Sequence, residues 1–199
     1  MGYTHYWTLK KAANDPVRFK EAIDLFKELW AAAPKTVTAV VWGRDKDGNA
    51  GWVKKRFKKE KLLKGGLGKG EPIITDTCLR FNGDAEYELD HETFSIGLDS
   101  FNDEWLHREN GDVWAFCKTA RKPYDLAVCL ALMAFKDVFG DDFEYSSDGV
   151  TRESITKPEN LDYWKSIGWK SEIEYEWKRA YRVYDKYMAD QVAASVLAR

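Results

Sequence analysis

The stretch YDLAVCLALMAFKDVF, residues 124 to 139, is apolar on nearly every side of a helix over its first three turns. A helix of that kind lies in the centre of a fold rather than on its surface. Pro123 fits the first helical position, where its missing N–H costs no hydrogen bond, and Gly140 ends the segment. The sequence therefore predicts a buried central helix.

Two further segments have helical periodicity. Asp15 and Pro16 open the first, which ends near Pro34 and places apolar residues at three- and four-residue steps: Phe19, Ile23, Phe26, Leu29 and Trp30. The second runs from 171 to 197 with the stripe Ile173, Trp177, Tyr181, Tyr184, Met188 and Val192. We expect this C-terminal stripe to pack against the sheet, or against a second copy of the chain in a homodimer, rather than to stack on bases.

Strands are predicted where β-branched and aromatic runs are bounded by turn residues: 3–9, 36–42, 73–81, 92–98, 112–118 and 143–147. Asp47, Gly48 and Asn49 predict a hairpin-like reversal toward Trp52 and Val53. The expected architecture is one α+β domain over residues 1–199, with a mostly antiparallel sheet packed against the central and C-terminal helices.

Composition excludes several protein classes. With 44% hydrophobic and 32% charged residues, the chain is neither disordered nor collagen-like. No apolar run approaches the roughly 18–20 residues of a membrane span, and the start of the chain does not match a signal peptide, so we expect a cytoplasmic protein with no membrane partner.

Cysteine usage argues against a metal site or a disulfide framework. The three cysteines, Cys78, Cys117 and Cys129, are an odd number without CxxC spacing, which is typical of reduced thiols. Neither a metal nor another cofactor is therefore expected. The nine Trp, ten Tyr and ten Phe residues exceed what a small core hides, so some of them should line a groove or an interface.

The net charge of −2 conceals a basic segment. Residues 54 to 70, KKRFKKEKLLKGGLGKG, contain eight Lys or Arg against the single acid Glu60. A Walker loop is excluded, because Leu63 and Gly70 stand where Gly and Ser or Thr are needed. We interpret the segment as a solvated Gly- and Lys-rich loop or insertion, or alternatively as a weak nucleic-acid contact through phosphates, which salt would weaken steeply.

A second basic group precedes the central helix. In FCKTARKPYD, residues 116 to 125, Lys118, Arg121 and Lys122 arrive at a predicted helix N-terminus, whose unpaired N–H groups favour an anion such as phosphate. The alternative is that these are solvated loop charges, with Asp125 complementing the helix dipole.

Histidine is scarce, and two of the three residues stand beside aromatics. His5 and His91 meeting in one pocket would suit acid and base catalysis on a phosphoester, with Lys118 stabilising the developing charge. The segment HETF, residues 91 to 94, matches only one of the two motifs that two-histidine phosphoesterases need. The alternative is two hydrogen-bonded structural histidines.

Five blocks of the chain carry a resemblance: GYTHYW (2–7), FNG (81–83), HETF (91–94), FCKTARKPYD (116–125) and SSDG (146–149). In these blocks the chain resembles a family of small uncharacterised proteins of bacteria and bacteriophages. The resemblance implies a shared set of polar and aromatic positions and no particular activity. The basic segment 54–70 departs from the shorter members of that family.

Three functions follow as hypotheses. In the first, a pocket between the 3–9 strand and the N-terminus of the central helix binds a nucleotide-like or other phosphorylated ligand. Its phosphate would meet Lys118, Arg121 and Lys122, and its base would stack on Tyr6, Trp7 and Tyr124. Asn82 and Asp148 would bind the polar edges of the base. In a bacteriophage, such a pocket would sequester a nucleotide signal of host defence. The second is a metal-independent phosphodiesterase or nucleotide hydrolase that uses His5 and His91, and the third is nucleic-acid binding or another interaction through 54–70.

Overall fold

The structure is a computed structural model that describes residues 3–149, 151–152 and 175–197. Short 3-10 turns join its helices and strands. In chain order these are β1 (Thr4–Leu9), α1 (Pro16–Ala32), β2 (Thr36–Arg44), β3 (Ala50–Lys58), β4 (Ile73–Ile74), β5 (Cys78–Phe81), β6 (Phe94–Gly97), β7 (Val113–Lys118), α2 (Asp125–Phe139), β8 (Phe143–Ser147) and α5 (Tyr175–Leu197). The α+β class predicted from the sequence is confirmed.

Helix α2 lies at the centre of the fold, as its sequence predicts. Every residue from Asp125 to Phe135 is buried, and the helix contacts α1, α5 and β8. The Phe135 ring lies 5.3 Å from Phe19 of α1 and 5.7 Å from Phe143 of β8, measured between ring centroids. Fully burying a side chain of this size stabilises the fold by about 1.5–3 kcal/mol. The consecutive buried side chains of α2 together therefore contribute much of the stability of the core.

In the described part of the chain, the strands form three separate antiparallel sheets rather than the single sheet predicted. The orders are β7-β1-β8, β2-β3 and β4-β5-β6. The prediction of one strand over 73–81 is also wrong, because Thr75 turns the chain: its hydroxyl accepts hydrogen bonds from the N–H groups of Thr77 and Cys78, which makes β4 and β5 a hairpin. A hydroxyl that competes for backbone N–H groups ends a strand.

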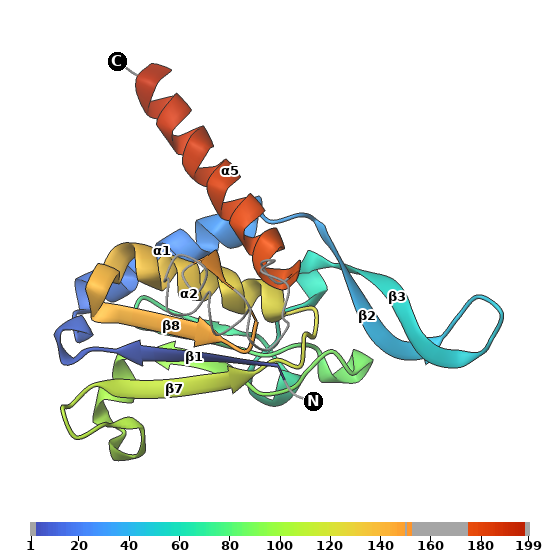
Figure 1. The fold of residues 1–199 in the computed structure, drawn as a ribbon, viewed down its shortest axis with the longest axis horizontal. Coiled ribbons are helices and arrows are strands. Elements are labelled where there is room, and N and C mark those ends of the chain that lie inside the picture. The colour runs from blue at the N-terminus through green and yellow to red at the C-terminus, as the bar shows by residue number, and fades with distance from the viewer. Residues whose placement is uncertain (1–2, 150, 153–174, 198–199) are drawn as a thin grey trace, which may run out of the picture.

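Strand β1 is the middle strand of its sheet, and its two faces differ (Figure 1). His5, Trp7 and Leu9 are buried on the face that the helices cover, whereas Tyr6 and Thr8 alternate onto the opposite face. There Tyr6 stacks against Trp114 of β7 at 6.3 Å, and Phe116 is 46% exposed. The Tyr6 and Trp7 side chains therefore point to opposite faces of the sheet, and only the Tyr6 ring lies on the open face.

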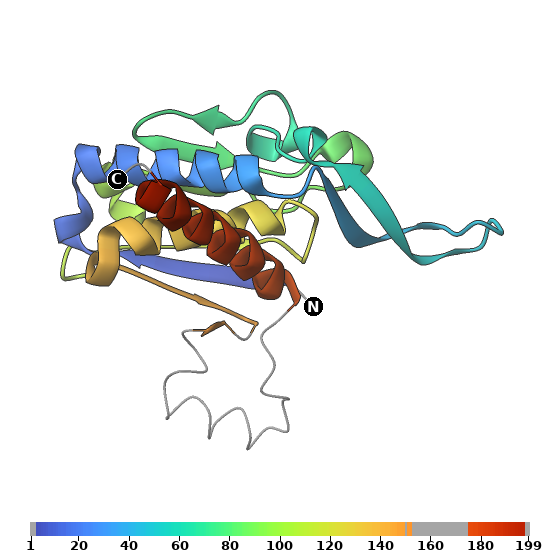
Figure 2. The same cartoon turned by 90° about the horizontal axis from the view of Figure 1, so that it is seen from above.

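Strands β2 and β3 form a ribbon that projects from the body of the molecule in both views (Figures 1 and 2). The two strands pair along their whole length, from Thr36 opposite Lys58 to Arg44 opposite Ala50. Asp45 builds the turn at the tip by accepting hydrogen bonds from the N–H groups of Asp47 and Asn49 at 2.9 Å. The prediction of a loop is thus wrong for residues 54–58, which belong to β3.

The base of the ribbon is fastened to α1 by Lys59. Its ammonium group donates hydrogen bonds to the carbonyls of Trp30, Ala31 and Ala33 at 2.6, 2.8 and 2.9 Å. Helix α1 has no basic residue in its own last turn, so Lys59 supplies the cation that a helix C-terminus favours. Partial burial and the charge of Lys35 lower the pKa of Lys59.

Replacing Lys59 by alanine should lower the free energy of unfolding by about 1–2 kcal/mol, because three carbonyls lose a charged donor. Urea unfolding followed by circular dichroism measures this loss. Lys58→Ala is the matched control: Lys58 is 71% exposed and should change stability by less than about 0.5 kcal/mol. Equal effects of the two variants would contradict the capping role.

Helix α5 is buried only through its first half. Trp177, Ala180, Tyr181 and Val183 are buried, whereas Val192 is 64% exposed and the C-terminal end rises away from the body (Figure 1). The predicted stripe therefore packs against the core at Trp177 and Tyr181, while Ile173 lies outside the described residues. A homodimer through this helix stays a prediction.

Candidate functional site

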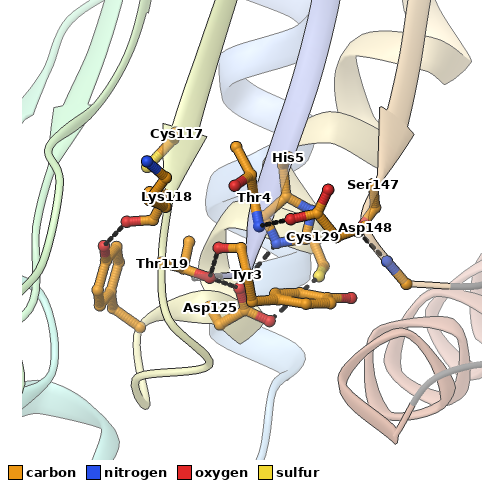
Figure 3. A network of polar contacts seen from close by, with 12 residues as sticks. Tyr3, Thr4, His5, Cys117, Lys118, Thr119, Asp125, Cys129, Ser147 and Asp148 are labelled. Atoms are coloured by element: carbon orange, nitrogen blue, oxygen red, sulfur yellow. Dashed lines mark hydrogen bonds and ion pairs between the residues drawn. The ribbon is translucent and has the colours of Figure 1, made fainter. Parts of the chain in front are cut away.

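Two regions were singled out by sequence: the end of the β7-β1-β8 sheet where β1 begins, and the basic segment. In the first region, the loop between β7 and α2 lies against the start of β1 (Figure 3). The N–H groups of Thr119 and Ala120 donate to the carbonyl of Tyr3, at 2.8 and 3.2 Å. Ala120 and Arg121 both have positive φ, 50° and 56°, which L-residues seldom adopt. The loop is thus held in one unusual shape by its contacts to β1.

The buried partners of this loop form a network around Asp125 (Figure 3). The Nε2 atom of His5 lies 2.7 Å from Asp125 Oδ1, and the hydroxyl of Thr119 donates to the same oxygen. The Cys129 thiol lies 3.8 Å from Oδ2. His5 and Asp125 are 0% and 1% exposed. Four side chains from β1, the loop and α2 are therefore locked together in the interior.

The network fixes which nitrogen of His5 carries a proton. Because Nε2 lies at hydrogen-bond distance from a carboxylate, it is the donor. Nδ1 has no hydrogen-bond partner among the described residues, and the rings of Tyr3 and Trp177 meet the imidazole edge-on at 5.1 and 5.5 Å. A buried N–H without an acceptor is costly, so the tautomer with its hydrogen on Nε2 fits this site better than the one with its hydrogen on Nδ1.

His5, Asp125 and Cys129 are also a donor set for a metal, since their ligand atoms lie within 4.8 Å of one another. Their geometry fits hydrogen bonding better. A tetrahedral zinc ion with bonds of about 2.0–2.1 Å would hold nitrogen and oxygen about 3.3 Å apart, whereas His5 Nε2 and Asp125 Oδ1 are separated by 2.7 Å. The cluster is therefore a structural network that joins β1 to α2.

At the predicted phosphate site, an acidic side chain of the protein itself lies at the start of α2. Asp125, in the first helical turn, already supplies the negative charge that the helix N-terminus favours. The Arg121 guanidinium packs over the Tyr3 ring at 4.2 Å, and the Lys122 ammonium donates to the carbonyl of Glu88 at 2.5 Å. The position of Asp125 fits its dipole-complementing interpretation, and phosphate binding by Lys118, Arg121 and Lys122 stays a prediction.

Three of the predicted ligand-binding residues lie in the interior, which corrects the prediction for them. Trp7 packs on Phe94 with centroids 5.0 Å apart, and Tyr124 donates its hydroxyl hydrogen to the carbonyl of Glu92 at 2.7 Å. The Asn82 side chain bridges the backbone N–H and C=O of His91 at 3.1 Å each. None of these three is more than 2% exposed, so they cannot stack on or read a ligand in this structure.

Asp148 and His91 are exposed, and each is tied to backbone. Asp148 accepts from the N–H of Thr4 at 2.9 Å and from the Tyr6 hydroxyl at 3.2 Å. His91 Nδ1 lies 2.8 Å from the carbonyl of Lys118, which makes Nδ1 the donor. His91 is therefore exposed while His5 is fully buried, and no contact joins the two rings among the described residues. The structure does not bring them together as an acid–base pair.

The Cys117 thiol and the Tyr124 phenol, both near this network, are buried. Burial, reinforced by the charge of Asp125, raises the pKa of the Cys117 thiol, and burial likewise raises the pKa of Tyr124. Neither group is ionised near neutral pH, and only an ionised thiol is a good nucleophile. Sequence reasoning missed Thr119, Cys129 and Glu92 as partners in this region, because short polar side chains give no periodic signal.

The basic region differs from this end of the sheet because its charges are exposed. Residues 35 to 61, which comprise the ribbon and its base, carry nine Lys or Arg and three acids, a net charge of +6. The chain as a whole carries −2, so the remainder carries −8. Lys54, Lys55, Arg56 and Lys58 of β3 are all exposed. Positive charge is thus concentrated on the ribbon, which projects from the body (Figure 1).

Comparison with known proteins adds no relative: no family model, curated protein or solved structure matches the chain. The resemblance to a bacterial and bacteriophage family and the sequestration of a host-defence signal therefore stay predictions. Within the described ranges, no helix combines the length and the apolar character needed to cross a bilayer.

Proposed function

We propose that the protein binds nucleic acid through the β2–β3 ribbon. The observation that carries this proposal is the segregation of charge, +6 on residues 35–61 against −8 on the rest. A nucleic acid is attracted to the ribbon and repelled by the body, so the charge pattern both provides affinity and fixes orientation.

The geometry of β3 suits a phosphate backbone. Lys54, Arg56 and Lys58 occupy alternate positions and therefore share one face, with about 6.8 Å between successive Cα atoms. A duplex presents one phosphate per roughly 3.4 Å on each strand, so each of the three cations reaches a different phosphate. Two paired strands are also narrow enough to enter a major groove about 12 Å wide.

The acids of the ribbon indicate which part of it makes contact. Asp45 and Asp47 stand at the tip with Arg44 and Lys46, so the tip has no net positive charge, and backbone hydrogen bonds led by the N–H of Asn49 lower the pKa of Asp45. The side of β3 has no acid between Lys54 and Lys58. Contact through this side, rather than insertion of the tip, follows from that distribution.

The triple variant Lys54→Ala, Arg56→Ala, Lys58→Ala should bind a duplex at least about tenfold more weakly at low salt than the unmodified protein. Its plot of log K against log salt should be flatter by about 2 to 3, since each phosphate contact contributes about 0.9 to the slope. Fluorescence anisotropy with a labelled duplex of about 20 base pairs measures both quantities.

The control for this experiment removes the same charge from the body. Lys20→Ala, Lys27→Ala, Lys186→Ala alters three exposed lysines on α1 and α5 and should bind as the unmodified protein does. Equal weakening by both triple variants would reduce the effect to net charge and refute the ribbon as the binding surface.

A further inference from the structure

A cavity lies where the ribbon meets the body, and we infer that it takes an unpaired nucleotide of the bound strand. The inference rests on the proposed function. The cavity has a volume of about 290 Å³ and is lined by Arg56, Phe57, Lys58, Lys61, Tyr87 and Leu89. This volume is close to the lower end of the range for small-ligand sites.

The chemistry of the lining divides into two parts. Phe57, Tyr87 and Leu89 are apolar, while Arg56, Lys58 and Lys61 are exposed cations. A ligand that satisfies both parts has a flat apolar portion and a negative group, as a nucleotide has in its base and phosphate. An apolar peptide would leave the three cations unmatched.

Tyr87 is the side chain on which we expect the unpaired base to stack. It ends a short 3-10 turn, Ala85–Tyr87, and its side chain is 55% exposed although it lies beside a buried leucine. Base stacking on an exposed aromatic ring is a common mode of single-strand recognition, because every base has a π-face. The two neighbouring acids, Glu86 and Glu88, do not line the cavity in the part of the chain described.

The cavity is continuous with the proposed phosphate-binding side of β3. Arg56 and Lys58 belong both to that side and to the cavity lining. A strand whose phosphates follow β3 is therefore led to the cavity at the base of the ribbon. Paired bases cannot enter a site of this size, so a single-stranded overhang is the form that fits.

The test compares a blunt duplex with the same duplex carrying a short single-stranded overhang, by anisotropy in low salt. The unmodified protein should prefer the overhang by about tenfold, and Tyr87→Ala should remove the preference while leaving blunt-duplex binding unchanged. Tyr87→Phe keeps the ring and should keep the preference. Trp105→Ala, which removes a 96% exposed ring elsewhere, should also keep it.

The outcomes separate this inference from the proposed function. Equal binding of blunt and overhang duplexes, or a preference that survives in Tyr87→Ala, overturns the inference and leaves the ribbon proposal standing. Binding of neither DNA overturns both. If AMP alone binds in a Tyr87-dependent way while oligonucleotides do not, the cavity is a site for free nucleotide, and both the strand assignment and the ribbon proposal fail.

Discussion

Replacing Gly83 by alanine is expected to prevent the chain from reaching its native fold. A Cβ atom at this position would lie 1.9 Å from the carbonyl oxygen of Leu89 and 2.5 Å from its carbon. Both neighbours are backbone, so no side-chain rotation relieves the clash. The loop that Asn82 closes by binding the N–H groups of Gly83 and His91 would have to open. We expect a loss of more than about 4 kcal/mol.

A second glycine provides the control for this variant. An added Cβ at Gly66 meets no atom within 4 Å, so Gly66→Ala should keep the stability of the unmodified protein within about 1 kcal/mol. Circular dichroism and urea unfolding of the two purified variants give the comparison. A cooperative transition for Gly83→Ala at the same urea concentration as for Gly66→Ala would contradict the close approach to Leu89.

Asp125→Ala should have the second largest effect, a loss of about 3–5 kcal/mol in the free energy of unfolding. The carboxylate accepts from His5, Thr119 and Cys129 in the fully buried network, and its removal leaves the His5 Nε2 donor without that acceptor. Removing one member of a buried polar network costs the full desolvation of the group left behind.

The matched control is a carboxylate at the same end of the sheet that is exposed. Asp148 also accepts two hydrogen bonds, from Thr4 and Tyr6, but water replaces them when the side chain is removed. Asp148→Ala should therefore cost about 1 kcal/mol. Urea denaturation of both variants decides the matter, and equal losses would show that burial of the Asp125 network contributes nothing extra.

Local patterns predicted the helices well because their signals lie within a few residues. Asp15 caps α1 through the N–H groups of Val17 and Arg18, and the apolar run of α2 was enough to predict its burial. The ribbon could have been predicted further than it was. Continuing the pairing outward from the Asp47 turn would have placed Lys54, Arg56 and Lys58 opposite β2.

The candidate site was predicted less well, because its contacts join residues distant in sequence. His5 meets Asp125 only after β1 has paired with β7, and no local pattern reports that pairing. One signal was available and unused: residues alternate across a strand, so Tyr6 and Trp7 had to face opposite ways. The sequence did indicate one residue of the site correctly: Asp125, two residues after Pro123, was expected to complement the dipole of α2 and lies in its first turn.

The central position of β1 has a consequence for how the chain folds during synthesis. Its partners are Lys118 for Thr4 and Ser147 for His5, so the first strand made must wait for strands made much later. Pairings between such distant residues slow folding, and until they form both edges of β1 can pair with other chains. Until the later strands are made, the apolar side chains of Trp7 and Leu9 lack their native partners and favour aggregation of the emerging chain. A chaperone that shields apolar segments would reduce this aggregation.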